Sequence, residues 1–124
     1  VTLAANYIIG NLKLGAGLNY KSGKPYTQPD VNEPIDDTVF PNEINYQNPN
    51  SSRLPEYIRV DASAIYTMKL GRSAKGTIGA SILNITNRKN MLNTFYRLQE
   101  DNTIESIERV SLRMTPNASF RIQF

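Results

Sequence analysis

Apolar and polar residues alternate along the last stretch of the chain, from Val110 to Phe124. Successive side chains of a β-strand point to opposite faces, so this pattern predicts one long strand with an apolar face and a polar face. The run far exceeds the usual strand of about five or six residues, whereas a tilted strand that crosses a bilayer needs roughly nine to eleven. It therefore favours a strand in the wall of a membrane barrel. The expected apolar set is Val110, Leu112, Met114, Pro116, Ala118, Phe120, Ile122 and Phe124, and the expected polar set is Ser111, Arg113, Thr115, Asn117, Ser119, Arg121 and Gln123.

The same alternation recurs upstream and predicts four further strands. The fold class is therefore all-β, an antiparallel up-and-down meander of about five strands. Five strands are too few to close a barrel, because even the small natural barrels use about eight. We expect the meander to be part of a larger transmembrane barrel. The predicted strands cover residues 1–9, 12–21, 54–70, 76–98 and 110–124.

The connections between these strands alternate in length. Gly10-Asn11 and residues 71–75 supply short turns, whereas residues 22–52 form a long loop. The phase of the alternation slips at Leu83-Asn84, where we expect a β-bulge. Short turns on one side and long loops on the other are typical of an outer-membrane barrel, with the short turns in the periplasm. The expected aromatic girdle is Tyr7, Tyr66, Phe120 and Phe124 at the periplasmic interface and Tyr20 at the extracellular one.

The composition narrows the function classes. The 124 residues include no histidine and no cysteine. Without histidine the chain lacks the commonest general base and most zinc-binding patterns, so we expect no enzyme activity, no cofactor and no catalytic or metal-ligating residues. The formal charge is +3, but the basic residues stand singly along the predicted strands, and we expect no nucleic-acid binding.

The chain carries no apolar run long enough for a membrane helix and opens directly on an alternating segment. It also begins without the basic start and small-residue cleavage site of a signal peptide. We therefore expect a processed chain or a fragment.

The long loop over residues 22–52 is acidic, with Lys24 as its only basic residue. Clustered carboxylates suit a hard cation such as calcium, but the spacing lacks the order of a recognised calcium loop. A solvated loop and a cation site both remain open. The acidic residues are Asp30, Glu33, Asp36, Asp37 and Glu43.

Three motifs resemble the C-terminal barrel portion of TonB-dependent outer-membrane receptors, in the order and spacing of that family. The first is Ser22-Gly23-Lys24-Pro25-Tyr26-Thr27, a strand-ending turn. The second runs from Asn50 to Asp61 and contains Arg-Leu-Pro-Glu-Tyr-Ile-Arg-Val-Asp. The third, Ile82 to Asn90, reads Ile-Leu-Asn-Ile-Thr-Asn-Arg-Lys-Asn, and a terminal aromatic residue, Phe124, completes the likeness.

The resemblance covers essentially residues 1–124 and implies the last five strands of a twenty-two-stranded barrel, with the plug domain outside this chain. It implies active uptake of a scarce nutrient, such as a siderophore, vitamin, glycan or peptide, across the outer membrane of a Gram-negative bacterium. The implied partners are outer-membrane lipid, the remainder of the barrel, the plug, TonB acting through the plug, and a transported ligand that these motifs do not identify.

Four charged residues are candidates for facing the lumen or the plug, and one residue is a candidate assembly signal. Arg59 and Asp61 lie two apart on one strand face, close enough to pair with each other or with charges on the plug. Asn84, Asn87 and Asn90 are expected to hydrogen-bond local backbone near the bulge. The lumen-facing candidates are Arg59, Asp61, Arg113 and Arg121, and the assembly candidate is Phe124.

Two other interpretations remain. A soluble antiparallel β-sandwich could bind carbohydrate through the acidic loop with Tyr26 and Tyr46. A passive porin would share the barrel wall but lack the plug and the energy supply. A sandwich buries its apolar faces against each other and a barrel exposes them to lipid, so the packing of the apolar set separates the sandwich from the barrel.

Overall fold

The computed structural model describes residues 1–124 and consists of strands, turns and loops. No helix in it has the length and apolarity that crossing a membrane requires. The strands are β1 (Thr2–Ile9), β2 (Leu12–Lys21), β3 (Pro25–Tyr26), β4 (Ile35–Asp36), β5 (Glu43–Ile44), β6 (Ser52–Arg53), β7 (Tyr57–Leu70), β8 (Ala74–Leu83), β9 (Met91–Leu98), β10 (Ile104–Val110) and β11 (Thr115–Gln123).

The chain divides into two compact units. The first, here the sheet unit, comprises Val1–Lys21, Ile58–Lys89 and Leu112–Phe124. The second, here the loop unit, comprises Ser22–Tyr57 and Asn90–Ser111.

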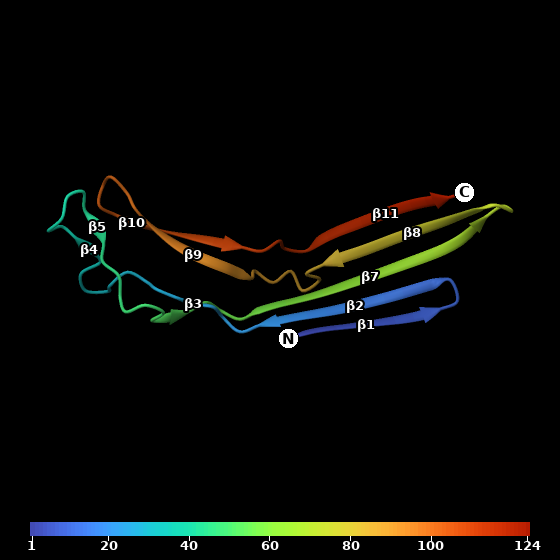
Figure 1. Cartoon of the computed structure of the whole chain (residues 1–124), viewed down its shortest axis with the longest axis horizontal. Coiled ribbons are helices and arrows are strands. Elements are labelled where there is room, and N and C mark those ends of the chain that lie inside the picture. The colour runs from blue at the N-terminus through green and yellow to red at the C-terminus, as the bar shows by residue number, and fades with distance from the viewer. The chain divides into compact units, whose positions relative to one another are not determined.

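The sheet unit is one five-stranded antiparallel sheet in the order β1-β2-β7-β8-β11 (Figure 1). Within the sheet unit, each strand lies beside the strands that precede and follow it along the chain. This arrangement confirms the all-β class and the antiparallel meander. The ladders are regular, with Ala64 opposite Ala80 and Ala80 opposite Ala118. The sheet is open, and β1 and β11 are its two edges.

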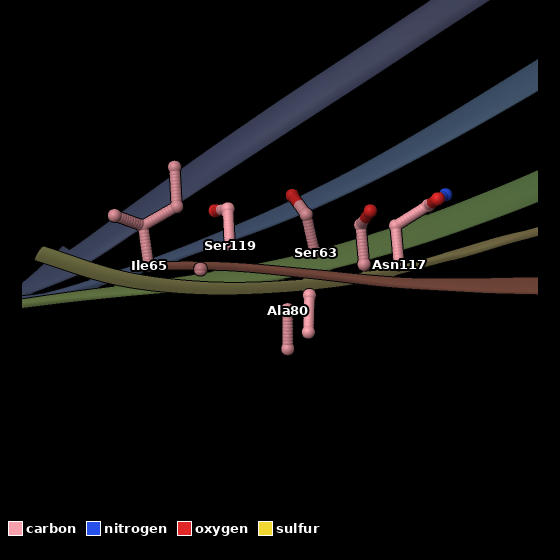
Figure 2. A pocket seen from close by; sticks show the side chains of 8 residues that line it. Ser63, Ile65, Ala80, Asn117 and Ser119 are labelled. Atoms are coloured by element: carbon pink, nitrogen blue, oxygen red, sulfur yellow. The ribbon is translucent and has the colours of Figure 1, made fainter. Parts of the chain in front are cut away.

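The two faces of this sheet differ as the alternation predicts. Ser63, Ile65, Asn117 and Ser119 project from one side, and Ala80 projects from the other (Figure 2). We call the side of Ser63 the polar face and the side of Ala80 the apolar face. The larger apolar-face side chains include Leu3, Tyr7, Leu14, Tyr66, Ile78, Phe120 and Ile122, and all seven are exposed.

The sheet unit has no buried apolar core. Leu54, in the loop unit, is the one large apolar residue of the chain that is buried, at 5% exposure, whereas Phe120 on the apolar face is 62% exposed. Sheets of soluble proteins bury an apolar face against a second layer. Here the face carries no such layer, and the predicted separation of the even and odd residues of β11 onto opposite faces is confirmed.

The two short turns lie where the sequence places them. Gly10 (φ 55°) and Gly71 (φ 74°) occupy left-handed backbone conformations, which glycine tolerates because it has no Cβ atom. Both turns and the last residue, Phe124, lie at the same end of the sheet (Figure 1). We call this the short-turn end. At the opposite end, β2 and β8 lead into the long connections.

The predicted last strand is wrong in its first part. Residues 111–114 separate β10 from β11, and β10 pairs with β9 in a hairpin of the loop unit. The fourth predicted strand is likewise divided, because β8 ends at Leu83 and β9 begins at Met91. Side chains of Asn84 and Asn87 bond the backbone of residues 112 and 114. These bonds replace a strand ladder and leave the apolar pattern unchanged, so alternation alone does not reveal the break.

The loop unit is built from short pairings. β3 pairs with β6, β4 with β5 and β9 with β10. The predicted long loop thus contains four two-residue strands, and the third predicted strand begins at Tyr57, a few residues after its expected start. The aromatic rings of Tyr46 and Tyr96 meet edge to face, with centroids 6.5 Å apart.

Candidate functional site

Arg59 and Asp61 form an ion pair on β7, as their spacing predicts. Arg59 Nη2 lies 2.9 Å and Nε 3.0 Å from the same oxygen, Asp61 Oδ2. The side chains are 35% and 20% exposed, respectively. The pair is thus partly shielded from water, and its attraction is stronger than that of a fully exposed surface pair.

The second carboxylate oxygen of Asp61 fixes the end of β8. Asp61 Oδ1 accepts a hydrogen bond of 2.9 Å from the backbone N–H of Asn84. Asn84 has a left-handed backbone (φ 52°), a conformation that asparagine tolerates better than most residues. If the pairing of Ile82 with Ala62 continued regularly, Val60 would lie opposite Asn84. Instead, the N–H of Ile85, one residue further along, donates to Val60 O at 2.8 Å. The hydrogen bonding therefore shifts at Leu83-Asn84, but β8 ends there instead of continuing through the predicted β-bulge.

The Asn84 side chain is fully buried, at 0% exposure. Its Nδ2 group donates to Arg88 O at 2.9 Å and to Leu112 O at 3.1 Å. Its Oδ1 atom accepts from Thr86 Oγ1 and from the N–H of Arg88, both at 3.2 Å. Both donors and both acceptor positions of the amide are therefore used. Asn84 joins β8 to the segment that precedes β11.

The other two asparagines of the third motif also lie among backbone partners. Asn87, with φ 51°, accepts the N–H of Met114 on its Oδ1 atom at 3.2 Å. Asn90 belongs to the loop unit, is 1% exposed, and accepts the N–H of Ser111 on its backbone oxygen at 2.9 Å. The expected bonding of local backbone is confirmed for the side chain of Asn84, which bonds Arg88, whereas the side chain of Asn87 bonds the distant backbone of Met114. The sequence did not single out Asn84 as the buried centre, and only its place beside the phase slip pointed to it.

The first motif packs against the start of the second within the loop unit. Pro25 and Tyr26 pair with Arg53 and Ser52, and the N–H of Leu54 donates to Lys24 O at 2.9 Å. Gly23 approaches the backbone of Leu54 so closely that a methyl group at this position would overlap the Leu54 carbonyl oxygen. The two motifs are about thirty residues apart in the chain, and glycine is needed where they meet.

The remaining candidates belong to the sheet unit and lie on β11 or directly beside it. Arg121 lies on β11 opposite Thr77 and is exposed. Arg113, expected on a strand, lies between β10 and β11, and its backbone oxygen accepts from Thr115 Oγ1 at 2.9 Å. Phe124 follows β11 and is 99% exposed. The structure thus brings Arg59 and Asp61 together but does not gather Arg113 or Arg121 with them.

Three tyrosines meet in the loop unit. The pKa of Tyr96 is raised, chiefly by partial burial and then by the neighbouring Tyr26 and Tyr46 hydroxyls. Tyr26 and Tyr46 entered the carbohydrate interpretation from the sequence, whereas Tyr96, far along the chain, did not. Its convergence with them depends on the fold of the loop unit, which no local pattern signals.

The acidic residues of the loop are engaged in turns. Asp30 Oδ1 accepts the N–H groups of Asn32 and Glu33. Asp36 Oδ1 accepts the hydroxyl and the N–H of Thr38, and these hydrogen bonds lower the pKa of Asp36. No group of three or more acidic side chains comes together as a metal site would require. The loop therefore offers no assembled ligand set for the cation considered above.

The two units carry opposite charge, which no single stretch of the sequence indicates. The sheet unit holds ten of the fourteen lysines and arginines and only one of the eleven acidic residues, Asp61. The loop unit holds the other ten acidic residues and four basic ones. The basic residues do stand singly along the strands, but the strands lie side by side and gather them on one sheet. A count along the chain conceals this because the two units are interleaved in sequence.

Comparison with known proteins identifies no relative: no family model, no curated protein and no solved structure matches the chain.

Proposed function

We propose that this chain is a wall segment of an outer-membrane barrel that actively imports a scarce nutrient with energy supplied through TonB. The observation that carries the proposal is the five-stranded sheet with an exposed apolar face and a polar face. In such a barrel the apolar face contacts lipid and the polar face lines the lumen. The resemblance of the three motifs to TonB-dependent receptors is the basis for proposing twenty-two strands, a plug and active uptake.

The exposed apolar face supports a lipid environment. Tyr66, Ile78 and Phe120 lie directly opposite one another on β7, β8 and β11, and all three are exposed on the apolar face. Burying apolar surface stabilises a protein by roughly 25 cal/mol per Å², so leaving such a row in water forgoes a large contribution. Lipid tails cover it without a second protein layer.

The open edges support a barrel of more strands. β1 and β11 have a neighbour on one side only. In a bilayer an unpaired backbone N–H or C=O costs several kcal/mol, so membrane sheets close on themselves. Five strands are too few for closure, since strand tilt and shear set a minimum near eight. The sheet therefore continues into neighbouring strands on both edges.

The ends of the sheet support an orientation. The turns at Gly10 and Gly71 lie at one end, and long connections leave the other. Outer-membrane barrels have short periplasmic turns and long extracellular loops. We therefore assign the short-turn end of the sheet to the periplasm and the end from which the long connections leave to the extracellular side.

The proposal is tested on the full-length protein in the bacterium that makes it. We expect it in the outer-membrane fraction, with an electrophoretic mobility that changes on heating, as folded barrels show. We also expect growth on the imported nutrient to stop when TonB is disrupted. Recovery in the soluble fraction would overturn the barrel. A folded barrel whose uptake is indifferent to TonB would indicate a passive porin instead.

A second candidate function, binding of carbohydrate by the loop unit, is favoured by the tyrosine cluster. Tyr46 is 47% exposed and meets Tyr96 edge to face at 6.5 Å. Aromatic rings with polar tips suit the flat apolar faces of sugars. The test is the affinity of the full-length protein for an oligosaccharide panel. A loss of binding in Tyr46→Ala, with Tyr20→Ala as the control outside the loop unit, would support it.

A further inference from the structure

Three basic side chains gather on the polar face at the short-turn end of the sheet. Lys69 of β7 and Lys75 of β8 are direct cross-strand partners. Arg121 of β11 pairs with Thr77, two residues along β8 from Lys75 on the same face. Direct partners have Cβ atoms about 5 Å apart and diagonal ones about 7–8 Å. All three side chains are exposed.

The sheet unit supplies no carboxylate side chain to balance these charges. Asp61 is its only acidic residue, and Asp61 is paired with Arg59. Along β7 it lies roughly 26 Å from Lys69, at about 3.3 Å per residue, which is well beyond the Debye length of about 8 Å in physiological salt. Like charges directly opposite on a sheet destabilise it. The cluster therefore gains stability from an external negative charge.

A shallow groove adjoins the cluster on the same face. It has a volume of about 380 Å³, and Figure 2 shows the side chains of Ser63, Ile65, Asn117 and Ser119 rising along it. Gly79 is buried because the Ser119 hydroxyl lies over it. The Ser63, Asn117 and Ser119 side chains offer polar contacts along the groove, and Ile65 offers an apolar one.

We propose that the polar face at the short-turn end binds a protein segment rich in aspartate and glutamate, whose carboxylates pair with Lys69, Lys75 and Arg121. The inference rests on the proposed function, because it takes the polar face to be the lumenal side of a barrel. The charge of the cluster selects an acidic occupant. The open groove and the spread of the cations over three strands fit an extended polypeptide better than a small enclosed anion.

The test uses the full-length protein in isolated outer membranes whose barrel is shown to be folded by heat-modifiable mobility. A water-soluble carbodiimide joins a lysine amine to a carboxylate only where the two are in contact. We expect peptides containing Lys69 and Lys75 to be joined to an acidic segment outside the 124 residues described here. The exposed Lys24 of the loop unit is the internal control and should remain uncoupled.

Acetylation of lysines gives a second readout. An amine that is ion-paired and covered by a bound segment reacts more slowly than an exposed one. We expect Lys69 and Lys75 to be acetylated several-fold more slowly than Lys24. In the variant Arg121→Gln, which keeps both lysine amines, coupling at Lys69 and Lys75 should decrease while the heat-modifiable mobility remains.

Three results would overturn the inference while leaving the barrel proposal intact. The first is a folded barrel in which Lys69 and Lys75 stay uncoupled and react as fast as Lys24. The second is coupling only to acidic residues of the loop unit. The third is protection of the two lysines by added inorganic pyrophosphate without any coupling, which would indicate a small anion. Absence of a folded barrel would instead overturn the proposed function itself.

Discussion

Different interactions stabilise the sheet unit and the loop unit. The sheet unit relies on long backbone ladders and on one buried amide, Asn84, while its apolar side chains remain exposed. The loop unit has only short pairings but contains the buried Leu54, and several of its acidic side chains bond nearby N–H groups. The sheet unit thus leaves its apolar side chains uncovered, whereas the loop unit combines a buried apolar residue with short pairings between distant segments.

The two units also differ in the sign of their net charge. The sheet unit is basic and the loop unit acidic, although the whole chain has a formal charge of only +3. A net charge thus says little about either unit. We therefore expect the effect of a substitution on stability to depend on the packing and the charge of the unit in which the substituted residue lies.

The largest effect is expected at the buried amide of the sheet unit. Asn84→Leu removes four side-chain hydrogen bonds and leaves the partner groups unsatisfied, and each such buried group costs about 1–3 kcal/mol. We expect a loss of about 3–5 kcal/mol, measured as the urea midpoint of the heat-modifiable form. Asn117→Ala, exposed on β11, is the control and should cost less than about 0.5 kcal/mol. Equal midpoints for the two variants would contradict the role of Asn84.

In the loop unit we expect the largest effect at Gly23. Gly23→Ala places a methyl group on the Leu54 carbonyl and should cost about 1–3 kcal/mol through overpacking. The loss should be confined to the loop unit, seen as faster hydrogen exchange of the Leu54 amide that bonds Lys24 O. At Gly17 an added Cβ would lie no closer than 3.9 Å to any neighbour, so Gly17→Ala is the control. Faster exchange throughout the sheet unit in Gly23→Ala would show that the two units are not independent.

Within the sheet unit, we expect Phe124 and Tyr66 to differ in their effect on barrel assembly. Phe124 follows an edge strand and packs on nothing, while Tyr66 lies on a central strand. If the terminal aromatic residue is captured by strand addition during assembly, its deletion should lower the amount of folded barrel several-fold more than Tyr66→Ala does. Heat-modifiable mobility in purified outer membranes measures both. An equal or smaller loss on deletion would leave Phe124 only an anchoring role at the periplasmic interface.

The smallest effect is expected at the Arg59–Asp61 pair. Asp61→Asn removes the charge but keeps an oxygen for the Asn84 N–H, so the loss should be about 1 kcal/mol. A double-mutant cycle with Arg59→Gln should give a coupling energy of about 0.5–1 kcal/mol, decreasing as salt is raised. Additive single effects would show that the ion pair contributes no interaction energy.

Much of the sheet unit could be predicted from the sequence, and much of the loop unit could not. Alternation and the glycine turns located the five strands of the sheet because period-two patterns and left-handed turns are local signals. The separation of β10 from β11 was missed because the Asn84 and Asn87 side chains take over backbone bonds across long stretches of chain. The approach of Gly23 to Leu54 and the meeting of Tyr26, Tyr46 and Tyr96 likewise depend on contacts between distant segments.

The barrel wall itself is tested most directly by spin labels placed one at a time along β11. The chain has no cysteine, so each cysteine introduced from Ala118 to Gln123 is the only one in this segment. In the full-length protein in bilayers, labels at Ala118, Phe120 and Ile122 should collide with dissolved oxygen, which concentrates in lipid. Labels at Ser119, Arg121 and Gln123 should collide instead with a water-soluble nickel complex, giving a period of two residues. Equal access at both sets, or even positions immobilised and shielded from both reagents, would contradict a lipid-facing wall.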